Sequence, residues 1–184
     1  CWGRSRLEET RRLTLDGGAL EFVILDDPAT AADVWKARGA LVKAVEATSE
    51  QEPVDIVVPI SRITDFIAFV SELERQSGVQ MVSFGHAGDG NVHLCVVRGA
   101  RTQEEWEQVH RTVMPRIYAK AYELGGLASG EHGIGLSKRD WFLCHTPEGN
   151  LRAMNRIKDA LDVRHILNDR KSYITGGESH AETV

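Results

Sequence analysis

The sequence has no long apolar run, and this absence argues against a membrane-spanning helix. No stretch approaches the roughly 20 apolar residues that such a helix needs. The opening residues, CWGRSRLEETRRL, also lack the pattern of a secretory leader, with its basic start and apolar centre. Because the chain begins at Cys1 and not at a methionine, we expect a fragment or a processed chain.

Cysteine is scarce, and positive charge does not dominate. Cys1, Cys95 and Cys144 are far apart, form no CxxC pair and are odd in number. This pattern disfavours a cysteine zinc site or a disulfide scaffold and suits a reducing compartment. We therefore expect a cytoplasmic protein, with peripheral attachment to a membrane left open.

The net charge of -5 argues against a nucleic-acid partner.

What is present is the composition of a globular protein, with 42% hydrophobic residues in a chain of 184. Residues 19–27, 54–60, 79–86 and 91–97 have the composition of strands. Helices are predicted at 27–47, 61–78, 102–126 and 147–167, and Pro115 should kink or divide the third. This order predicts an α+β fold with ferredoxin-like elements, in which helices pack on an antiparallel or mixed sheet.

Capping residues mark the predicted helix ends. Asp27 or Thr30 could cap the first helix, and Pro28 lies near its first turn. Ser61 is the expected cap of the second helix, and Gly78 its expected end. In the segment 127–142 the apolar residues show neither helical nor strand spacing, and this segment is predicted to be a loop.

The stretch GHAGDGNVH places two histidines around a glycine-rich turn. In the simplest register His86 and His93 sit opposite each other on one face of a hairpin, with Cβ atoms about 4.5–5.5 Å apart. Two imidazoles so placed suit one divalent metal ion. On spacing alone, a hairpin with two surface histidines is the simpler interpretation.

A second stretch, SGEHGIGLSK, supplies a third ligand type. Glu131 would complete a set of two histidines and one carboxylate, with open positions for substrate oxygens. His132 would face a different direction and could accept a proton near neutral pH. Taken alone, this stretch is more simply interpreted as a capping loop with a surface Glu-His pair.

Together, GHAGDGNVH and the later GEHGIG with its lysine resemble the C-terminal domain of FAD-linked oxidases. The members in question are of the D-lactate dehydrogenase, glycolate oxidase and D-2-hydroxyglutarate dehydrogenase type. VVPISRITDFI, VWKARGALV and ILNDRK resemble further family segments, and the resemblance spans about residues 19–171. It implies that another domain binds FAD and that this one covers the flavin and forms the substrate pocket. We expect 1–18 to be an extension or linker from the FAD-binding domain, 19–171 the substrate domain and 172–184 a flexible tail.

The resemblance also implies a role for each matching residue. His86, His93 and Glu131 would hold a divalent metal such as Zn or Mn, and His132 would take the substrate's hydroxyl proton. Two residues would contact the substrate, namely Arg38 and Cys95. Three residues would lie near the cofactor, namely Asn91, Asn168 and Lys171. The implied reaction oxidises a D-2-hydroxy acid to a 2-keto acid with hydride transfer to FAD. The implied partners are that acid, the FAD-binding domain and an electron acceptor, and a homo-oligomer is left open.

Departures from the family pattern bear on the substrate. Members that use a dicarboxylate carry an asparagine where this chain has Cys95, and a lysine just before Asp55, where this chain has Pro53 and Val54. The resemblance therefore implies a smaller or more apolar acid than 2-hydroxyglutarate. The family's closing Asn-Pro-Gly-Lys is also changed at Asp169 and Arg170.

Two other functions stay open at this point. One is a non-catalytic metal-binding or interaction module that keeps the motif without a flavin partner. The other is a metallohydrolase, which would need a second base that the sequence does not identify. An FAD domain encoded upstream of Cys1 would favour the dehydrogenase.

Overall fold

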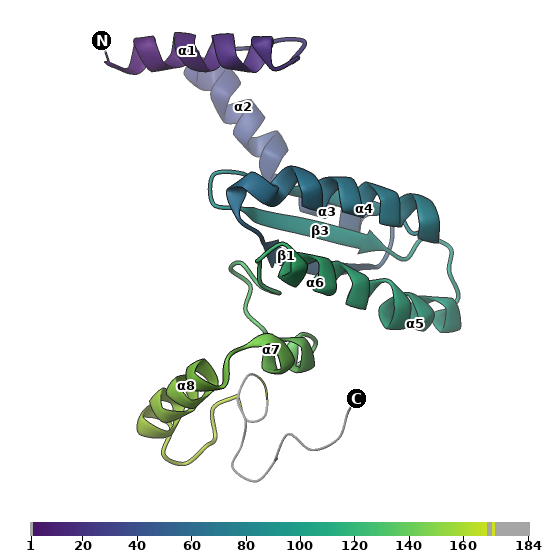
Figure 1. Cartoon of the computed structure of the whole chain (residues 1–184). Helices are drawn as coiled ribbons and strands as arrows, with labels where there is room; N and C mark the ends of the chain where they lie inside the picture. The colour runs from purple at the N-terminus through teal and green to yellow at the C-terminus, as the bar shows by residue number, and fades with distance from the viewer. Residues whose placement is uncertain (1, 169–170, 172–184) are drawn as a thin grey trace. The chain divides into compact units, whose positions relative to one another are not determined.

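The structure is a computed structural model that describes residues 2–168 and 171. The chain divides into two compact units, Cys1–Ala44 and Val45–Val184. In the first unit, α1 (Trp2–Asp16) is followed by α2 (Pro28–Gly39), and α3 (Leu41–Glu46) begins at its end (Figure 1). Asp27 is the cap of α2, as predicted, because its carboxylate accepts the N–H of Thr30 at 2.8 Å.

The predicted strand over 19–27 is wrong, because these residues form no strand. Strand residues are stabilised by a neighbouring ladder, and the described part of the first unit contains no strand to pair with. Leu20 and Val23 accordingly lie exposed. The single helix predicted over 27–47 is also divided, since the backbone turns at Ala40, whose N–H bonds to Ala37 O at 3.1 Å.

The second unit contains a three-stranded antiparallel sheet in the order β1-β3-β2. Its strands are β1 (Gln51–Val57), β2 (Met81–His86) and β3 (Asn91–Val97). A short helix η1 (Ile60–Arg62) and α4 (Ile63–Ser77) connect β1 to β2, and α5 (Gln103–Thr112) and α6 (Met114–Glu123) follow β3. The α+β fold is confirmed, and the sheet is antiparallel rather than mixed.

The two faces of this sheet differ in chemistry, because side chains alternate along each strand. One face is apolar and forms the core with α4, α5 and α6, which contribute residues such as Phe66, Trp106 and Ile117. The sheet supplies to that core Val54, Ile56, Met81, Val92, Leu94 and Val96. The opposite face carries the polar residues of the motifs, which leaves them free of the helix-covered core.

The remaining boundaries follow local chemistry. Pro115 divides the predicted long helix into α5 and α6, and Thr102 caps α5 through a capping box with Glu105. Gly78 ends α4 in the left-handed conformation, as predicted. Ser61 is not the cap of α4, because it lies inside η1, where the N–H of Arg62 bonds to Pro59 O at 2.7 Å.

Two C-terminal helices depart from the predicted pattern. The expected loop contains α7 (Arg139–His145) near its end. The last helix, α8 (Glu148–Leu161), ends before the predicted position 167. It ends there because the Asp162 carboxylate accepts the backbone N–H groups of Ile166 and Leu167, which form a turn instead. The expected flexible tail, 172–184, lies outside the described residues.

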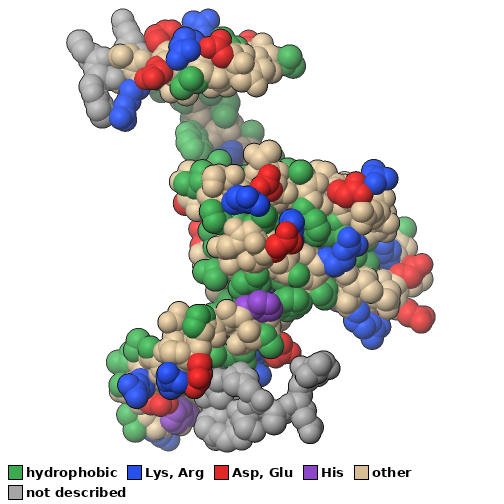
Figure 2. Space-filling model, viewed as in Figure 1, with side chains coloured by type: hydrophobic (Ala, Val, Ile, Leu, Met, Phe, Trp, Pro, Cys, Tyr) green, Lys and Arg blue, Asp and Glu red, His purple; other side chains and the backbone are tan. Residues whose placement is uncertain are grey.

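Over the described residues, no helix combines the length and the apolar character that crossing a bilayer requires. On the face shown in Figure 2, acidic and basic side chains are interspersed over the body that holds the sheet. That face therefore offers no broad basic surface of the kind that nucleic acid binds.

Candidate functional site

The β2–β3 hairpin places both histidines on the polar face of the sheet. His86 pairs with Asn91, and His93 pairs with Phe84, so the expected direct pairing of the two histidines is wrong. The turn over 87–90 makes them diagonal neighbours instead. They still share a face, and their ring centroids lie 5.2 Å apart at an angle of 86°.

The loop that carries Glu131 is brought to this face by the edge of β1. Leu127 forms a bridge with Val57, in which the Leu127 N–H bonds to Val57 O at 2.9 Å. The following residues then cross the sheet next to Asn91. A Cβ at position 130 would lie 2.6 Å from Asn91 Nδ2, so this crossing needs the glycine that the sequence provides.

Asp55, in the middle of β1, anchors this loop. Its Oδ2 accepts the hydroxyl of Ser129 at 2.8 Å and the backbone N–H groups of residues 130, 131 and 132 at 2.9, 2.9 and 2.7 Å. Burial would raise the pKa of Asp55, but the N–H groups of His132 and Glu131 and the Ser129 hydroxyl outweigh it and hold the pKa at about 2. The carboxylate is therefore ionised at neutral pH.

Asp55 was named from the sequence only as a reference point for the residues before it. A usable signal was present, because a single acid interrupts the otherwise apolar run VDIVV. A fully buried carboxylate needs several donors, and such an acid indicates a polar partner across the fold.

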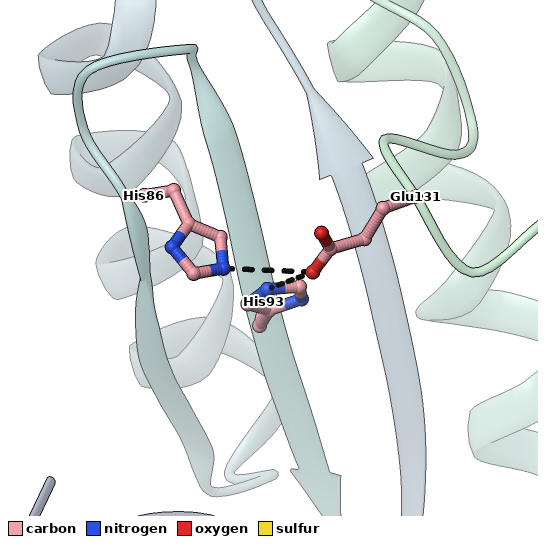
Figure 3. Close-up of side chains that lie close together, drawn as sticks. All are labelled: His86, His93 and Glu131. Carbon is pink, nitrogen blue, oxygen red and sulfur yellow. Dashed lines mark ion pairs between the residues drawn. The ribbon is translucent and has the colours of Figure 1, made fainter. Parts of the chain in front are cut away.

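The structure brings together the three predicted metal ligands (Figure 3). Glu131 Oε1 lies 3.5 Å from His86 Nε2 and 3.2 Å from His93 Nε2. One ligand atom from each residue lies within 4.8 Å of the others. Two imidazole nitrogens and one carboxylate oxygen are a donor set that suits zinc and other first-row divalent ions.

The environment of His93 also suits a ligand. Burial lowers the pKa of His93, while the Asp55 carboxylate acts in the opposite direction and His132 lowers it further. A neutral imidazole is the form that binds a metal ion. Asp55 Oδ1 and His93 Nδ1 are both buried and, among the described residues, neither has a hydrogen-bond partner. These residues therefore fit a divalent cation.

The sequence predicted that His132 and Glu131 would face different directions, but both side chains reach the same cluster. The ring of His132 stacks on His93 with centroids 5.1 Å apart, and its Nε2 is 3.8 Å from Glu131 Oε1. The side chain is 56% exposed, so a molecule bound at the cluster can reach it from solvent. Its role as a base stays a prediction.

Cys95 and Asn91 are more buried than a ligand-contacting role suggests. Cys95 shares the face of His93, and burial raises the pKa of its thiol. Asn91 packs beneath Gly130. Over the part of the chain that the structure describes, the buried Oδ1 of Asn91 has no hydrogen-bond partner. Of the two departures before Asp55, Val54 faces the core and only Pro53 shares the polar face, since Pro53 pairs with Cys95.

The other predicted contact residues are not among the converging ligands of the cluster. Arg38 is on α2 in the first unit, and its guanidinium carbon lies 5.7 Å from the centre of the Trp35 ring. Lys171 Nζ donates to Asn168 Oδ1 at 3.1 Å. Asp169 and Arg170, between them, lie outside the described residues. The substrate and cofactor roles of these residues stay predictions.

The family described as "FAD linked oxidases, C-terminal domain" matches residues 3–172. A D-lactate dehydrogenase of Anaerostipes hadrus is 37% identical over 166 residues, which cover 90% of this chain and 35% of that protein. The mitochondrial D-lactate dehydrogenase [cytochrome] of Kluyveromyces lactis is 28% identical over 181 residues, covering 95% of this chain and 31% of that protein.

Glycolate oxidase subunit GlcD of Bacillus subtilis is 34% identical over 119 residues, covering 65% of this chain and 25% of that protein. The chain thus spans about a third or less of the length of these relatives. The matched region contains both histidine motifs, GHAGDGNVH and GEHGIG, and therefore all three residues of the cluster. The chain belongs to the family of FAD linked oxidases, C-terminal domain.

Proposed function

We propose that this chain is the substrate-binding part of an FAD-dependent dehydrogenase that oxidises a D-2-hydroxy acid to a 2-keto acid. The observation that carries the proposal is the convergence of His86, His93 and Glu131, with His132 beside them. The names of two relatives, D-lactate dehydrogenase and glycolate oxidase, support a small hydroxy acid. FAD, bound mainly by another domain of the parent protein, would supply the two-electron acceptor.

His86, His93 and Glu131 would hold the cation through His86 Nε2, His93 Nε2 and a Glu131 carboxylate oxygen. A bound divalent ion would act as a Lewis acid toward the hydroxyl and carboxylate oxygens of the acid. Three protein ligands leave positions open for those two oxygens.

His132 would accept the hydroxyl proton at Nε2. The stacking contact with His93 holds this ring next to the cluster, and its exposed edge leaves room for the substrate. An imidazole is suited to this step because its unperturbed pKa lies near neutrality.

The face around the cluster favours a monocarboxylic acid. Pro53 and Cys95 are paired neighbours on that face, and neither offers a charged group to a second carboxylate. We propose that the acid is smaller or more apolar than 2-hydroxyglutarate. Substrate profiling of the parent enzyme with D-lactate, glycolate and D-2-hydroxyglutarate would test this, and a preference for the dicarboxylate would contradict it.

The cation site can be tested on the 184-residue chain itself. We expect calorimetric titration with Zn²⁺ or Mn²⁺ at neutral pH to show one site. His93→Ala and Glu131→Ala should each weaken binding by more than the 10–100-fold that outer-shell changes typically cost. His110→Ala, on α5 outside the cluster, is the matched histidine control and should bind as the wild type does.

A second measurement separates the dehydrogenase from a non-catalytic module. The dehydrogenase predicts that D-2-hydroxy acids reduce the flavin of the parent protein, as seen in its visible spectrum. A parent protein that binds the cation but leaves its flavin oxidised with every acid tested would favour the module. A chain that binds no cation would contradict the proposed metal centre.

A further inference from the structure

We propose that Asp55 is the positioning residue of the candidate metal centre, in which one carboxylate oxygen fixes the Glu131 loop and the other orients His93. The expected effect of Asp55 on cation binding rests on the proposed cation site. The contacts of Asp55 with the loop and with His93 do not depend on that site. Asp55 suits this role because it lies between the loop and the hairpin and is fully buried.

Oδ2 carries the first half of this role. Three consecutive backbone N–H groups and the Ser129 hydroxyl converge on this one atom, all within 2.9 Å. Their convergence fixes the backbone at Glu131 and His132. Ser129 Oγ also accepts the N–H of Gly133 at 2.9 Å, which closes the loop on its far side.

Oδ1 carries the second half. Asp55 and His93 are directly paired across β1 and β3, and Oδ1 lies 3.7 Å from His93 Nδ1. Both atoms are buried and, among the described residues, lack a hydrogen-bond partner. A shift of about half an ångström to one ångström would bring the pair into the 2.7–3.2 Å range of a hydrogen bond.

The other nitrogen of the same ring faces the cluster, since His93 Nε2 lies 3.2 Å from Glu131 Oε1. The ring is therefore held with Nδ1 toward the buried carboxylate and Nε2 toward the ligand position. This is the arrangement by which carboxylates orient metal-binding histidines in proteins generally. It keeps the proton on Nδ1 and leaves the Nε2 lone pair for a cation.

An Asp55→Asn substitution separates the two halves. Asparagine has one acceptor oxygen and one NH₂ group. If the oxygen accepts the loop donors, the NH₂ faces His93 Nδ1 and donates where the carboxylate would accept. His93 would then keep its proton on Nε2, the atom that a cation needs. The loop should therefore stay in place while cation binding weakens.

The test uses the 184-residue chain with ¹⁵N-labelled histidine, Zn²⁺ as the probe and amide hydrogen exchange. In the zinc-loaded wild type we expect His93 to carry its proton on Nδ1. Asp55→Asn should lower Zn²⁺ affinity about 10–100-fold, move the proton to Nε2 and leave the amides of 130–132 protected. Asp65→Asn, on α4 and paired with Arg62, is the control and should change none of these.

Ser129→Ala tests the division between the two oxygens without removing the carboxylate. It should speed amide exchange at Gly133 and leave the His93 tautomer unchanged. Wild-type zinc affinity in Asp55→Asn, or zinc bound through His93 Nδ1 in the wild type, would overturn the proposal.

If the wild type binds no zinc, the proposed metal centre fails, and the metal-free proteins still decide the role of Asp55. An Nδ1 proton on His93 that is lost in Asp55→Asn would support the role. The same tautomer in both proteins would refute it.

Discussion

Glu131 and His132 are neighbours in the chain, and Asp55 accepts the backbone N–H groups of both. In the parent enzyme we expect His132→Ala to lower kcat by about 10²–10⁴-fold, because a general base typically contributes that much. The isolated variant chain should still bind Zn²⁺, since His132 is not among the three converging ligands. Steady-state kinetics with D-lactate and calorimetry check the two halves.

The matched variant for that experiment is His86→Ala, which should lose cation binding as well as turnover. A His132→Ala enzyme with wild-type kcat/KM would place the base elsewhere. Loss of zinc binding in His132→Ala would instead make His132 a ligand.

Gly130 packs directly against the side chain of the buried Asn91. An added Cβ would lie 2.6 Å from Asn91 Nδ2 and 2.8 Å from its Cγ, so the buried Asn91 side chain would have to move. We expect Gly130→Ala to lower the free energy of unfolding by about 1–3 kcal/mol, the usual cost of overpacking. Denaturant unfolding followed by circular dichroism would measure this change.

Two comparisons test the cause of that change. Asn91→Ala in the Gly130→Ala background should remove most of the added cost, because it removes the clashing atoms. Gly149→Ala on α8, where the nearest atom is 4.0 Å away, should be neutral or stabilising by up to about 1 kcal/mol. Equal effects at positions 130 and 149 would contradict the close approach to Asn91.

At the scale of elements, the turn after α8 depends on one carboxylate. A hydrogen bond from Lys158 lowers the pKa of Asp162, burial opposes it, and the N–H groups of Leu167 and Ile166 add to the lowering, giving a pKa of about 2. The ordinary value is 3.8, so the folded state binds this proton less readily than the unfolded state. The stabilisation is therefore complete above about pH 4 and is lost as the pH falls toward 2.

A carboxyl ¹³C titration should place the Asp162 midpoint near 2, and the turn over 162–167 should open below it. Asp162→Asn at neutral pH should show the same opening at the Ile166 or Leu167 amide, because these two N–H groups bond to different oxygens of Asp162 and asparagine has only one. A midpoint near 3.8 would show that the carboxylate is not held by these donors.

At the scale of the whole molecule, the sequence contains the cluster residues but no G-x-G-x-x-G pattern of the kind that holds dinucleotide phosphates between a strand and a helix. We therefore expect the isolated chain to show no flavin absorbance and no turnover of D-2-hydroxy acids. A visible spectrum of the purified chain tests this. Near-stoichiometric flavin would mean that these residues bind the cofactor by themselves.

Much of the second unit could be predicted from the sequence, because its signals are local. The bounds of β3 follow from the alternation of side chains along a strand, and the buried stripe of Phe66, Val70 and Leu73 follows from the helical period of 3.6 residues. The break at Pro115 follows from the geometry of that one residue. The two histidine motifs also identified the cluster residues, because a tight turn accounts for the glycines in these motifs but not for the histidines.

What the sequence left undecided depends on contacts between distant residues. The diagonal placement of His86 and His93 follows from the register that the turn imposes, and the failure of the strand over 19–27 follows from the lack of a neighbouring strand among the described residues of its unit. The role of Asp55 needed the loop 129–132 to cross β1, a contact between residues more than 70 positions apart. Periodicity determines which face a side chain occupies, and only the tertiary structure decides what lies across from it.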